Sequence, residues 1–342
     1  MRAAVLEEIG KPLCLSDVAD PVLARDEVLV ETRACGICRT DLHIQDGLAY
    51  VPRLPHILGH EPAGVVVDVG CDVTSPKIGE PVVPHLFVAD RDCRYTRAGR
   101  HAQALHLRGI LGVSLPGGFA RYFKAPARNL LVVPEGVPFD LAGLTSCAVI
   151  TAVHAFRQAE LGPLDTAIVL GAGGIGLILV QLLRAAGVRT AAVDISPANL
   201  EQARRAGAEV TALFDAPDSL ECLRELAGAG KDGVDCVFEL VGRAATMQFA
   251  AAVAARGGRI IVIGEEAEFP AVDTITLAQR ELQIIGSRNG GMQDARDALE
   301  LLAQGVLRPP IGGYFSLDRI NEAFDFVRSG QAQGRVIITP ND

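Results

Sequence analysis

The sequence predicts an α/β protein in which a doubly wound parallel sheet follows a β-rich first region. Residues 1–130 contain short apolar or β-branched runs between Gly, Pro and Asp, with no long helical period. From about residue 150, short strands alternate with helical patterns that end in glycine. Strands joined through helices lie parallel in one sheet. The length of 342 residues indicates about two domains.

Individual elements follow from these patterns. In the first region we expect strands at Val28–Arg33, Gly64–Val69 and Pro81–Pro84. In the second we expect six strands, at Ala167–Leu170, Thr190–Val193, Glu209–Leu213, Val234–Leu240, Arg259–Gly264 and Leu282–Gly286. Pro197–Ala206 is a predicted helix, capped by Ser196 and ended by Gly207. The tail departs from the alternation, with helices and a last strand predicted at Gln293–Gln304, Asp318–Ser329 and Arg335–Ile338.

Charge and cysteine usage exclude several classes of function. The net charge is −9, from 32 basic and 41 acidic residues with no basic block, so nucleic acid is not an expected partner. No signal peptide is recognisable, and eight scattered Cys favour reduced thiols or metal ligands in a cytoplasmic protein. Thr166–Leu183 is uncharged, but its clustered glycines predict a strand, a turn and a helix and no membrane span.

The stretch Cys35–Glu61 concentrates thiols, imidazoles and carboxylates, mostly on predicted loop. A catalytic zinc usually has three protein ligands and one open position. Cys38 and His60 are candidates, and Cys147, about 20 residues before a glycine-rich loop, is the candidate third. The pattern predicts a catalytic zinc site.

Other cysteines fit this site less well. Cys35 and Cys38 form a C-x-x-C, which is also found in redox pairs and in structural zinc sites, but no second C-x-x-C accompanies it. The remaining candidates, Cys14, Cys71, Cys222 and Cys236, are predicted to be small buried apolar residues.

A dinucleotide site is predicted where Gly171-Ala-Gly173-Gly174-Ile175-Gly176 follows a strand and opens a helix. The first Gly permits the turn, the second lets the backbone approach a pyrophosphate, and the third allows close helix–strand packing. Asp194 ends the next strand, and its carboxylate can bind both ribose hydroxyls and repel a 2′-phosphate. The pattern favours NAD over NADP. The alternative is that Asp194 is only a turn residue at a strand end.

Together these motifs resemble the medium-chain zinc alcohol dehydrogenases along the whole chain. The matching segments are G-x-C-x-T-D at Gly36–Asp41, G-H-E-x-x-G at Gly59–Gly64, Cys147 before a helix, the glycine loop with Asp194, and Gly334-Arg335-Val336. The resemblance implies a GroES-like β-barrel catalytic domain at 1–150, completed by 287–342. It also implies an inserted Rossmann NAD-binding domain at 151–286.

The resemblance also implies roles for residues near the metal. Its ligands would be Cys38, His60 and Cys147, and Glu61 would lie beside it. Asp41 would orient His60. The alternative for Asp41 is a turn former.

Proton transfer and cofactor contacts are implied in the same way. Thr40 would hydrogen-bond the substrate oxygen, and His43 would form the outer end of a proton relay through a cofactor ribose. Arg39 and Arg335 would lie against the pyrophosphate. The alternatives are a solvated histidine at His43 and surface charges at Arg39 and Arg335.

The chain departs from the family where most relatives bind a second, structural zinc through four Cys. Of the four positions only Cys93 keeps a thiol, and the others are Asp90, Thr96 and Ala104. We therefore expect one zinc per chain. By alignment, the substrate pocket draws on partly apolar segments, namely Gly47–Val51, His85–Phe87 and Asn289–Met292.

The resemblance implies a zinc-dependent oxidoreductase that moves a hydride between an alcohol and NAD, giving an aldehyde or ketone reversibly. Its partners would be a small alcohol or carbonyl compound and further copies of the chain, as a homodimer or homotetramer. One alternative is a polyol- or sugar-type dehydrogenase of the same superfamily, in which a Glu usually replaces the third Cys. Others are a zinc-free quinone or enoyl reductase and a non-catalytic NAD-binding sensor.

Overall fold

The computed structural model describes residues 1–50, 52–216, 223, 226, 232–266, 268 and 270–341. The chain forms two compact units. Unit 1 comprises Met1–Ile150, Gly290–Gly305 and Pro310–Asp342, and unit 2 comprises Thr151–Asn289 and Val306–Pro309. The chain therefore leaves unit 1, forms most of unit 2 and returns to unit 1, with Val306–Pro309 again in unit 2.

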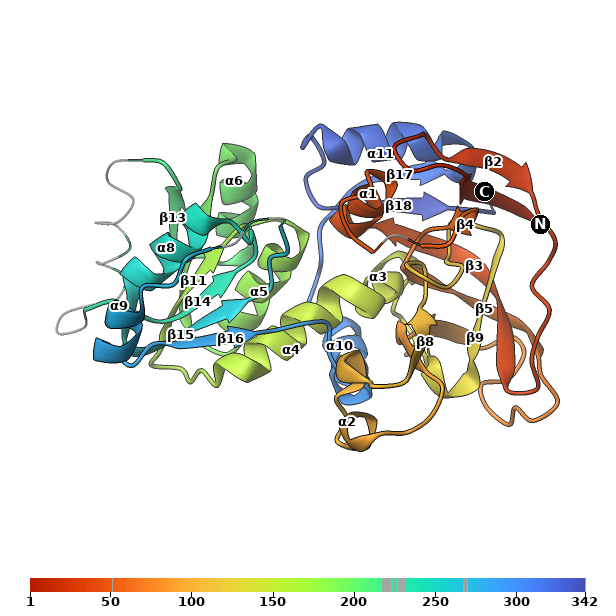
Figure 1. The fold of residues 1–342 in the computed structure, drawn as a ribbon, viewed down its shortest axis with the longest axis horizontal. Helices are drawn as coiled ribbons and strands as arrows, with labels where there is room; N and C mark the ends of the chain where they lie inside the picture. The colour runs from red at the N-terminus through yellow and green to blue at the C-terminus, as the bar shows by residue number, and fades with distance from the viewer. Residues whose placement is uncertain are drawn as a thin grey trace. The chain divides into compact units, whose positions relative to one another are not determined.

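Unit 1 is built on a seven-stranded sheet with the order β10-β6-β5-β3-β18-β17, in which β9 also pairs with β3. The C-terminal strand β18 (Arg335–Thr339) lies antiparallel to β3 (Glu27–Ile37), with Ile337 opposite Gly36. Figure 1 shows these strands side by side, although they come from opposite ends of the chain. The other strands of the sheet are β5 (Glu61–Val69), β6 (Pro81–Pro84), β9 (Tyr122–Pro126), β10 (Leu130–Val132) and β17 (Ile311–Ser316).

Smaller elements complete unit 1. One further sheet contains β1 (Arg2–Leu6), β2 (Cys14–Asp17) and β4 (His56–Ile57), and another contains β7 (Phe87–Ala89) and β8 (Leu107–Ile110). The α-helices are α1 (Arg39–Gln45), α2 (Arg94–Arg97), α3 (Phe139–Leu144), α10 (Met292–Ala303) and α11 (Ile320–Arg328). Short 3-10 helices are η1 (His101–Gln103), η2 (Ala127–Asn129) and η4 (Leu317–Arg319). Apolar side chains from both ends of the chain meet in the core, where Phe119 and Phe324 pack edge to face with ring centroids 5.9 Å apart.

Unit 2 is a six-stranded parallel sheet with the order β13-β12-β11-β14-β15-β16. The strands are β11 (Thr166–Leu170), β12 (Arg189–Asp194), β13 (Val210–Leu213), β14 (Val234–Glu239), β15 (Ala254–Val262) and β16 (Gln283–Gly286). The helices are α4 (Ile150–Ala159), which begins at the last residue of unit 1, α5 (Gly174–Ala185), α6 (Pro197–Ala206), α8 (Ala244–Val253) and α9 (Thr274–Gln279). The strand order reverses between β11 and β14, as in doubly wound dinucleotide-binding sheets. The predicted doubly wound parallel sheet is therefore confirmed.

Local signals in the sequence account for the best-placed elements. Helix α6 begins at Pro197, Ser196 Oγ accepts the Asn199 N–H at 3.4 Å, and Gly207 ends the helix with φ 118°. Thr166–Leu183 forms β11, a turn and most of α5, as predicted.

Two expectations were wrong. Residues 39–45 are not loop but helix α1, and β15 begins at Ala254, five residues before the predicted start. Cys147 precedes helix α4, as the resemblance implies, and lies within a longer helical run. That run, Phe139–Ala159, is long and apolar enough to cross a bilayer, but 67% of its apolar window is buried within the fold, which is typical of a core helix.

Candidate active site

The first part of the site is the junction between β3 and α1. Cys38 is the N-cap of α1, and its backbone N–H donates to Asp41 Oδ2 at 2.8 Å. A Cβ atom on Gly36 would lie 2.2 Å from Glu61 Oε2, so only glycine allows the Glu61 carboxylate to lie against β3. Gly36 belongs to the G-x-C motif, but the motif alone does not predict this packing role.

Asp41 connects this junction to His60. Its Oδ1 lies 3.0 Å from His60 Nδ1 and accepts the Gly59 N–H at 3.3 Å, and all these groups are buried. Because a carboxylate only accepts, Nδ1 carries the proton and Nε2 keeps its lone pair for a metal. Burial lowers the pKa of His60, but the charge and hydrogen bond of Asp41 together with those of Cys38 outweigh this effect, and the net shift is well upward. Asp41 is therefore more than a turn former.

Cys147 comes from a different part of unit 1. It lies in a π-helical segment, η3 (Thr145–Val149), between α3 and α4. Such wide turns often occur at functional sites. The neighbouring Ser146 Oγ donates to the carbonyl of Pro84 at 2.9 Å, which fixes the segment to the end of β6.

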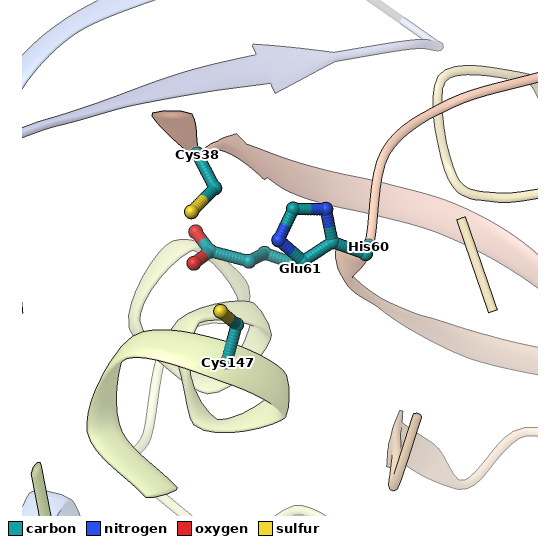
Figure 2. A group of neighbouring side chains, drawn as sticks. All are labelled: Cys38, His60, Glu61 and Cys147. Atoms are coloured by element: carbon teal, nitrogen blue, oxygen red, sulfur yellow. The ribbon is translucent and has the colours of Figure 1, made fainter. Parts of the chain in front are cut away.

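These elements bring four potential metal ligands together (Figure 2). One ligand atom from each of Cys38, His60, Glu61 and Cys147 lies within 4.8 Å of the others, and the part of the chain that the structure describes holds no second group of this kind. A hydrogen bond between the two thiols lowers the pKa of Cys38 and raises that of Cys147. Cys38 is thus the first of the two to become a thiolate, the form that binds metal.

Glu61 forms a buried ion pair at the edge of this cluster. Its Oε1 lies 3.0 Å from an Arg335 guanidinium nitrogen, yet neither carboxylate oxygen has a hydrogen bond of good geometry. Burial raises the pKa of Glu61 to about 7, and Arg335 opposes this rise. Two thiols, an imidazole nitrogen and a carboxylate without hydrogen bonds form a donor set that fits a zinc ion.

Arg335 is not a surface charge, because only 9% of it is exposed. The structure places its guanidinium beside Glu61. Its contact with a pyrophosphate stays a prediction, as does that of Arg39, which is exposed at the start of α1.

The predicted proton-transfer residues also lie on α1. Thr40 is half-buried, and its Oγ1 lies 3.8 Å from Cys38 Sγ. His43 lies one turn later, also half-buried, and the described residues include no hydrogen bond between its ring and Thr40. Their relay role stays a prediction.

The glycine loop of unit 2 has the geometry that its sequence predicts. Gly171 has φ 103°, which favours glycine, and a Cβ on Gly176 would lie 2.1 Å from the Gly171 carbonyl oxygen. Gly173 is the N-cap of α5, which begins with Gly174 and Ile175. Asp194 Oδ2 accepts the Ala172 N–H at 2.7 Å, so the predicted ribose ligand lies directly against the loop.

The remaining cysteines correct part of the sequence interpretation. Cys14 and Cys71 are exposed, so the prediction that they are buried was wrong, because both lie where the chain runs along the surface. Cys236 and Cys35 are buried, and Cys35 does not belong to the ligand cluster. Cys222 lies outside the described residues.

The loop at residues 90–104, where the sequence predicts no structural zinc, has its own internal contacts. Thr96 Oγ1 accepts the Cys93 N–H at 2.9 Å and donates to the Cys93 carbonyl at 3.1 Å. The guanidinium of Arg94 lies 4.6 Å from the Tyr95 ring centroid, and that of Arg100 lies 5.6 Å away. Hydrogen bonds and cation–π contacts therefore hold this loop, in addition to packing.

The segments predicted to line the substrate pocket lie partly in the core of unit 1. Leu86 and Phe87 are buried, and Tyr50 packs against the same core. His85 is also buried, with Nε2 donating to the Gly290 carbonyl at 3.1 Å. Val51 lies outside the described residues.

Comparison with known proteins agrees with this geometry. Two family models match the chain, "Alcohol dehydrogenase GroES-like domain" over residues 24–135 and "Zinc-binding dehydrogenase" over residues 174–304. The chain is 34% identical to an alcohol dehydrogenase of Geobacillus stearothermophilus over 343 residues, covering 99% of both chains. It is 31% identical to the NAD-dependent alcohol dehydrogenase of Sulfurisphaera tokodaii, covering 99% of this chain and 100% of the relative. The crystal structure of the Aeropyrum pernix alcohol dehydrogenase matches with a TM-score of 0.91 and 30% identity, covering 99% of this chain and 100% of the other.

Proposed function

The chain belongs to the medium-chain zinc-dependent alcohol dehydrogenase family, and from this premise we propose that Cys38, His60 and Cys147 hold its catalytic zinc. The protein is an NAD-dependent oxidoreductase that interconverts an alcohol and the corresponding aldehyde or ketone. The observation that carries the residue assignment is the buried cluster of ligand atoms within 4.8 Å of one another, with Asp41 bound to the far side of the His60 ring.

Each residue of the cluster has a distinct part. When bound, the zinc supplies a Lewis acid that lowers the pKa of the substrate hydroxyl or polarises a carbonyl. Asp41 fixes the tautomer of His60 and, through the Cys38 N–H, the start of α1. Glu61 adds a carboxylate beside the ligands, and Arg335 compensates its charge.

Proton transfer is assigned to α1. Thr40 would accept the proton of the substrate hydroxyl and pass it toward the imidazole of His43. Cofactor binding is assigned to the glycine loop, with Asp194 on the adenosine ribose and Arg39 and Arg335 on the pyrophosphate. A bound nicotinamide would supply the group that accepts a hydride from the alcohol carbon or donates one to the carbonyl carbon.

A matched pair of variants tests the metal assignment. Cys38→Ser removes a proposed ligand, and Cys35→Ser changes the other thiol of the same C-x-x-C, which is buried outside the cluster. We expect C38S to lose its zinc and at least 99% of its alcohol-dependent NADH formation, roughly a hundredfold, and C35S to retain both. Zinc content and NADH absorbance with a panel of alcohols measure this. Full activity after complete removal of zinc by a chelator would refute the assignment.

The same panel discriminates between the remaining alternatives. A preference for polyols over simple alcohols would indicate the polyol- or sugar-type dehydrogenases, although Cys147 stands where those usually have Glu. NAD binding without turnover of any alcohol would indicate a sensor. The ligand cluster argues against a zinc-free reductase, which has no use for it.

Domain limits and assembly belong to the proposal too. We assign 1–150 and 287–342 to the catalytic domain and 151–286 to the NAD-binding domain, in a cytoplasmic homodimer or homotetramer. The edge strand β16 supports assembly, because Ile284 on it and Ile275 on α9 are exposed by 38% and 66%. Ile284→Lys should shift the mass in sedimentation analysis toward the monomer. A wild-type protein that is already monomeric would refute the assembly.

A further inference from the structure

Glu239, at the end of β14, is a fully buried carboxylate that pairs with no basic side chain among the described residues. Its Oε1 accepts the N–H groups of Val241 at 3.0 Å and Gly242 at 2.9 Å, and Oε2 also accepts from Gly242 at 2.9 Å. Its backbone carbonyl accepts the N–H groups of Ile263 at 2.8 Å and Gly264 at 3.0 Å. One residue therefore binds four N–H groups from two loops, 240–242 after β14 and 263–266 after β15.

The position of Glu239 in the sheet connects it to the cofactor. It lies in register with Leu170, the residue before the glycine loop, and on its other side with Val262. Strands β11 and β14 flank the point where the strand order reverses, and dinucleotides bind at the carboxyl ends of the strands there. The glycine loop and Asp194 belong to the adenosine half. By the two-fold repeat of such sheets, the ends of β14 and β15 receive the nicotinamide half.

The two loops and the glycine loop are in close backbone contact. A Cβ on Gly264 would lie 2.4 Å from the Gly242 nitrogen, and a Cβ on Gly171 would lie 3.2 Å from Val241 Cγ2. Gly242 has φ 84°, a conformation that favours glycine. With so little free space, a shift of the 240–242 loop would displace its neighbours at this edge of the sheet.

We propose that Glu239 is a positioning residue that fixes the 240–242 and 263–266 loops for the nicotinamide half of the cofactor. The inference rests on the dinucleotide site proposed above. A carboxylate suits this role because both its oxygens accept, and it faces only N–H donors. An amide of the same shape would direct its NH2 group at the Gly242 N–H in one orientation, and in the other it would leave the Val241 N–H unpaired.

The test separates the two halves of the cofactor by using AMP, which carries only the adenosine half, and NADH. For Glu239→Gln we expect the Kd for NADH, measured by its fluorescence, to rise about tenfold, equivalent to about 1.4 kcal/mol, with the Kd for AMP within about twofold of wild type. Glu209→Gln is the matched control, because Glu209 is exposed just before β13, the edge strand that is separated from β14 by two other strands. It should leave both constants unchanged.

Each of the remaining outcomes would overturn either the positioning role of Glu239 or the dinucleotide site. Unchanged NADH binding in Glu239→Gln, or an equal loss of NADH and AMP binding, would overturn the positioning role, because the second result indicates only general damage to unit 2. If Glu239→Gln does not fold, Glu239→Asp keeps the charge but shortens the reach, and the same split between NADH and AMP is expected at about threefold. A wild-type protein that binds neither NADH nor AMP would instead refute the dinucleotide site itself.

Discussion

The replacement Asp41→Asn gives the sharpest test of how the metal centre is held. In the native structure the Asp41 carboxylate faces donors on both sides, with the His60 ring and the Gly59 N–H on Oδ1 and the Cys38 N–H on Oδ2. An amide has only one oxygen. If that oxygen stays on His60, the NH2 group meets the Cys38 N–H and leaves it buried and unpaired. If the amide is reversed, the NH2 group donates to Nδ1 and drives the ring proton to Nε2, the nitrogen that should bind zinc.

Either orientation weakens zinc binding. A buried unpaired N–H costs about 1–3 kcal/mol, and loss of a carboxylate partner to a histidine ligand lowers metal affinity by about 10- to 100-fold. We therefore expect the zinc Kd of Asp41→Asn, measured by competition with a chromogenic chelator, to rise by about 10- to 100-fold. The activity at saturating zinc should fall less.

Asp46→Asn is the control, because Asp46 ends the same helix and its exposed ion pair with Arg328 should contribute about 0–1 kcal/mol. Both variants should remain folded by circular dichroism. A folded Asp41→Asn protein with wild-type zinc affinity would show that the hydrogen bond to His60 does not position the ligand.

Three further predictions concern cofactor choice, pH and metal content. Asp194→Gly should raise the NADP/NAD ratio of kcat/KM by about tenfold, and an unchanged ratio in steady-state kinetics would mean that the ribose site is elsewhere. Burial lowers the pKa of His85 to about 4, against an ordinary value of 6.5. Between pH 6.5 and 4 the unfolded chain therefore binds more protons at His85 than the folded chain does. The contribution of His85 to the free energy of unfolding should be fully present above pH 6.5 and be lost as the pH falls from 6.5 to 4. His85→Asn should remove up to about 3 kcal/mol of this loss in denaturant titrations, and an unaltered pH dependence would contradict it. Metal analysis should find one zinc per chain, since only Cys93 remains of the structural set, and two tightly held ions would refute this.

Short-range signals in the sequence were sufficient to predict much of the fold. Helix α6 has its limits where Ser196 and Gly207 place them, because a cap and a left-handed glycine act within a few residues. Helix α1 was missed because its N-cap is Cys38, a residue that the usual capping preferences do not include. The available signal was the acidic residue Asp41 in the first helical turn, whose carboxylate accepts the Cys38 N–H.

Contacts that depend on strand register could not be predicted from the sequence. Motif spacing indicated Cys38, His60 and Cys147, but nothing near Arg335 in the sequence shows that its guanidinium lies beside Glu61. That contact requires Gly36 to pair with Glu61 on one side and with Ile337 on the other. A slip of one residue in either pairing would turn these side chains to the opposite face of the sheet.

The register of β18 therefore has a chemical consequence. Glu61 belongs to a strand in the first region of the chain, and the cation that compensates it arrives with the last strand. A buried carboxylate without its partner is costly, so the metal centre should reach its final electrostatic state only after the C-terminal segment has joined unit 1. The return of the chain from unit 2 thus completes both the sheet and the charge balance around the proposed zinc ligands.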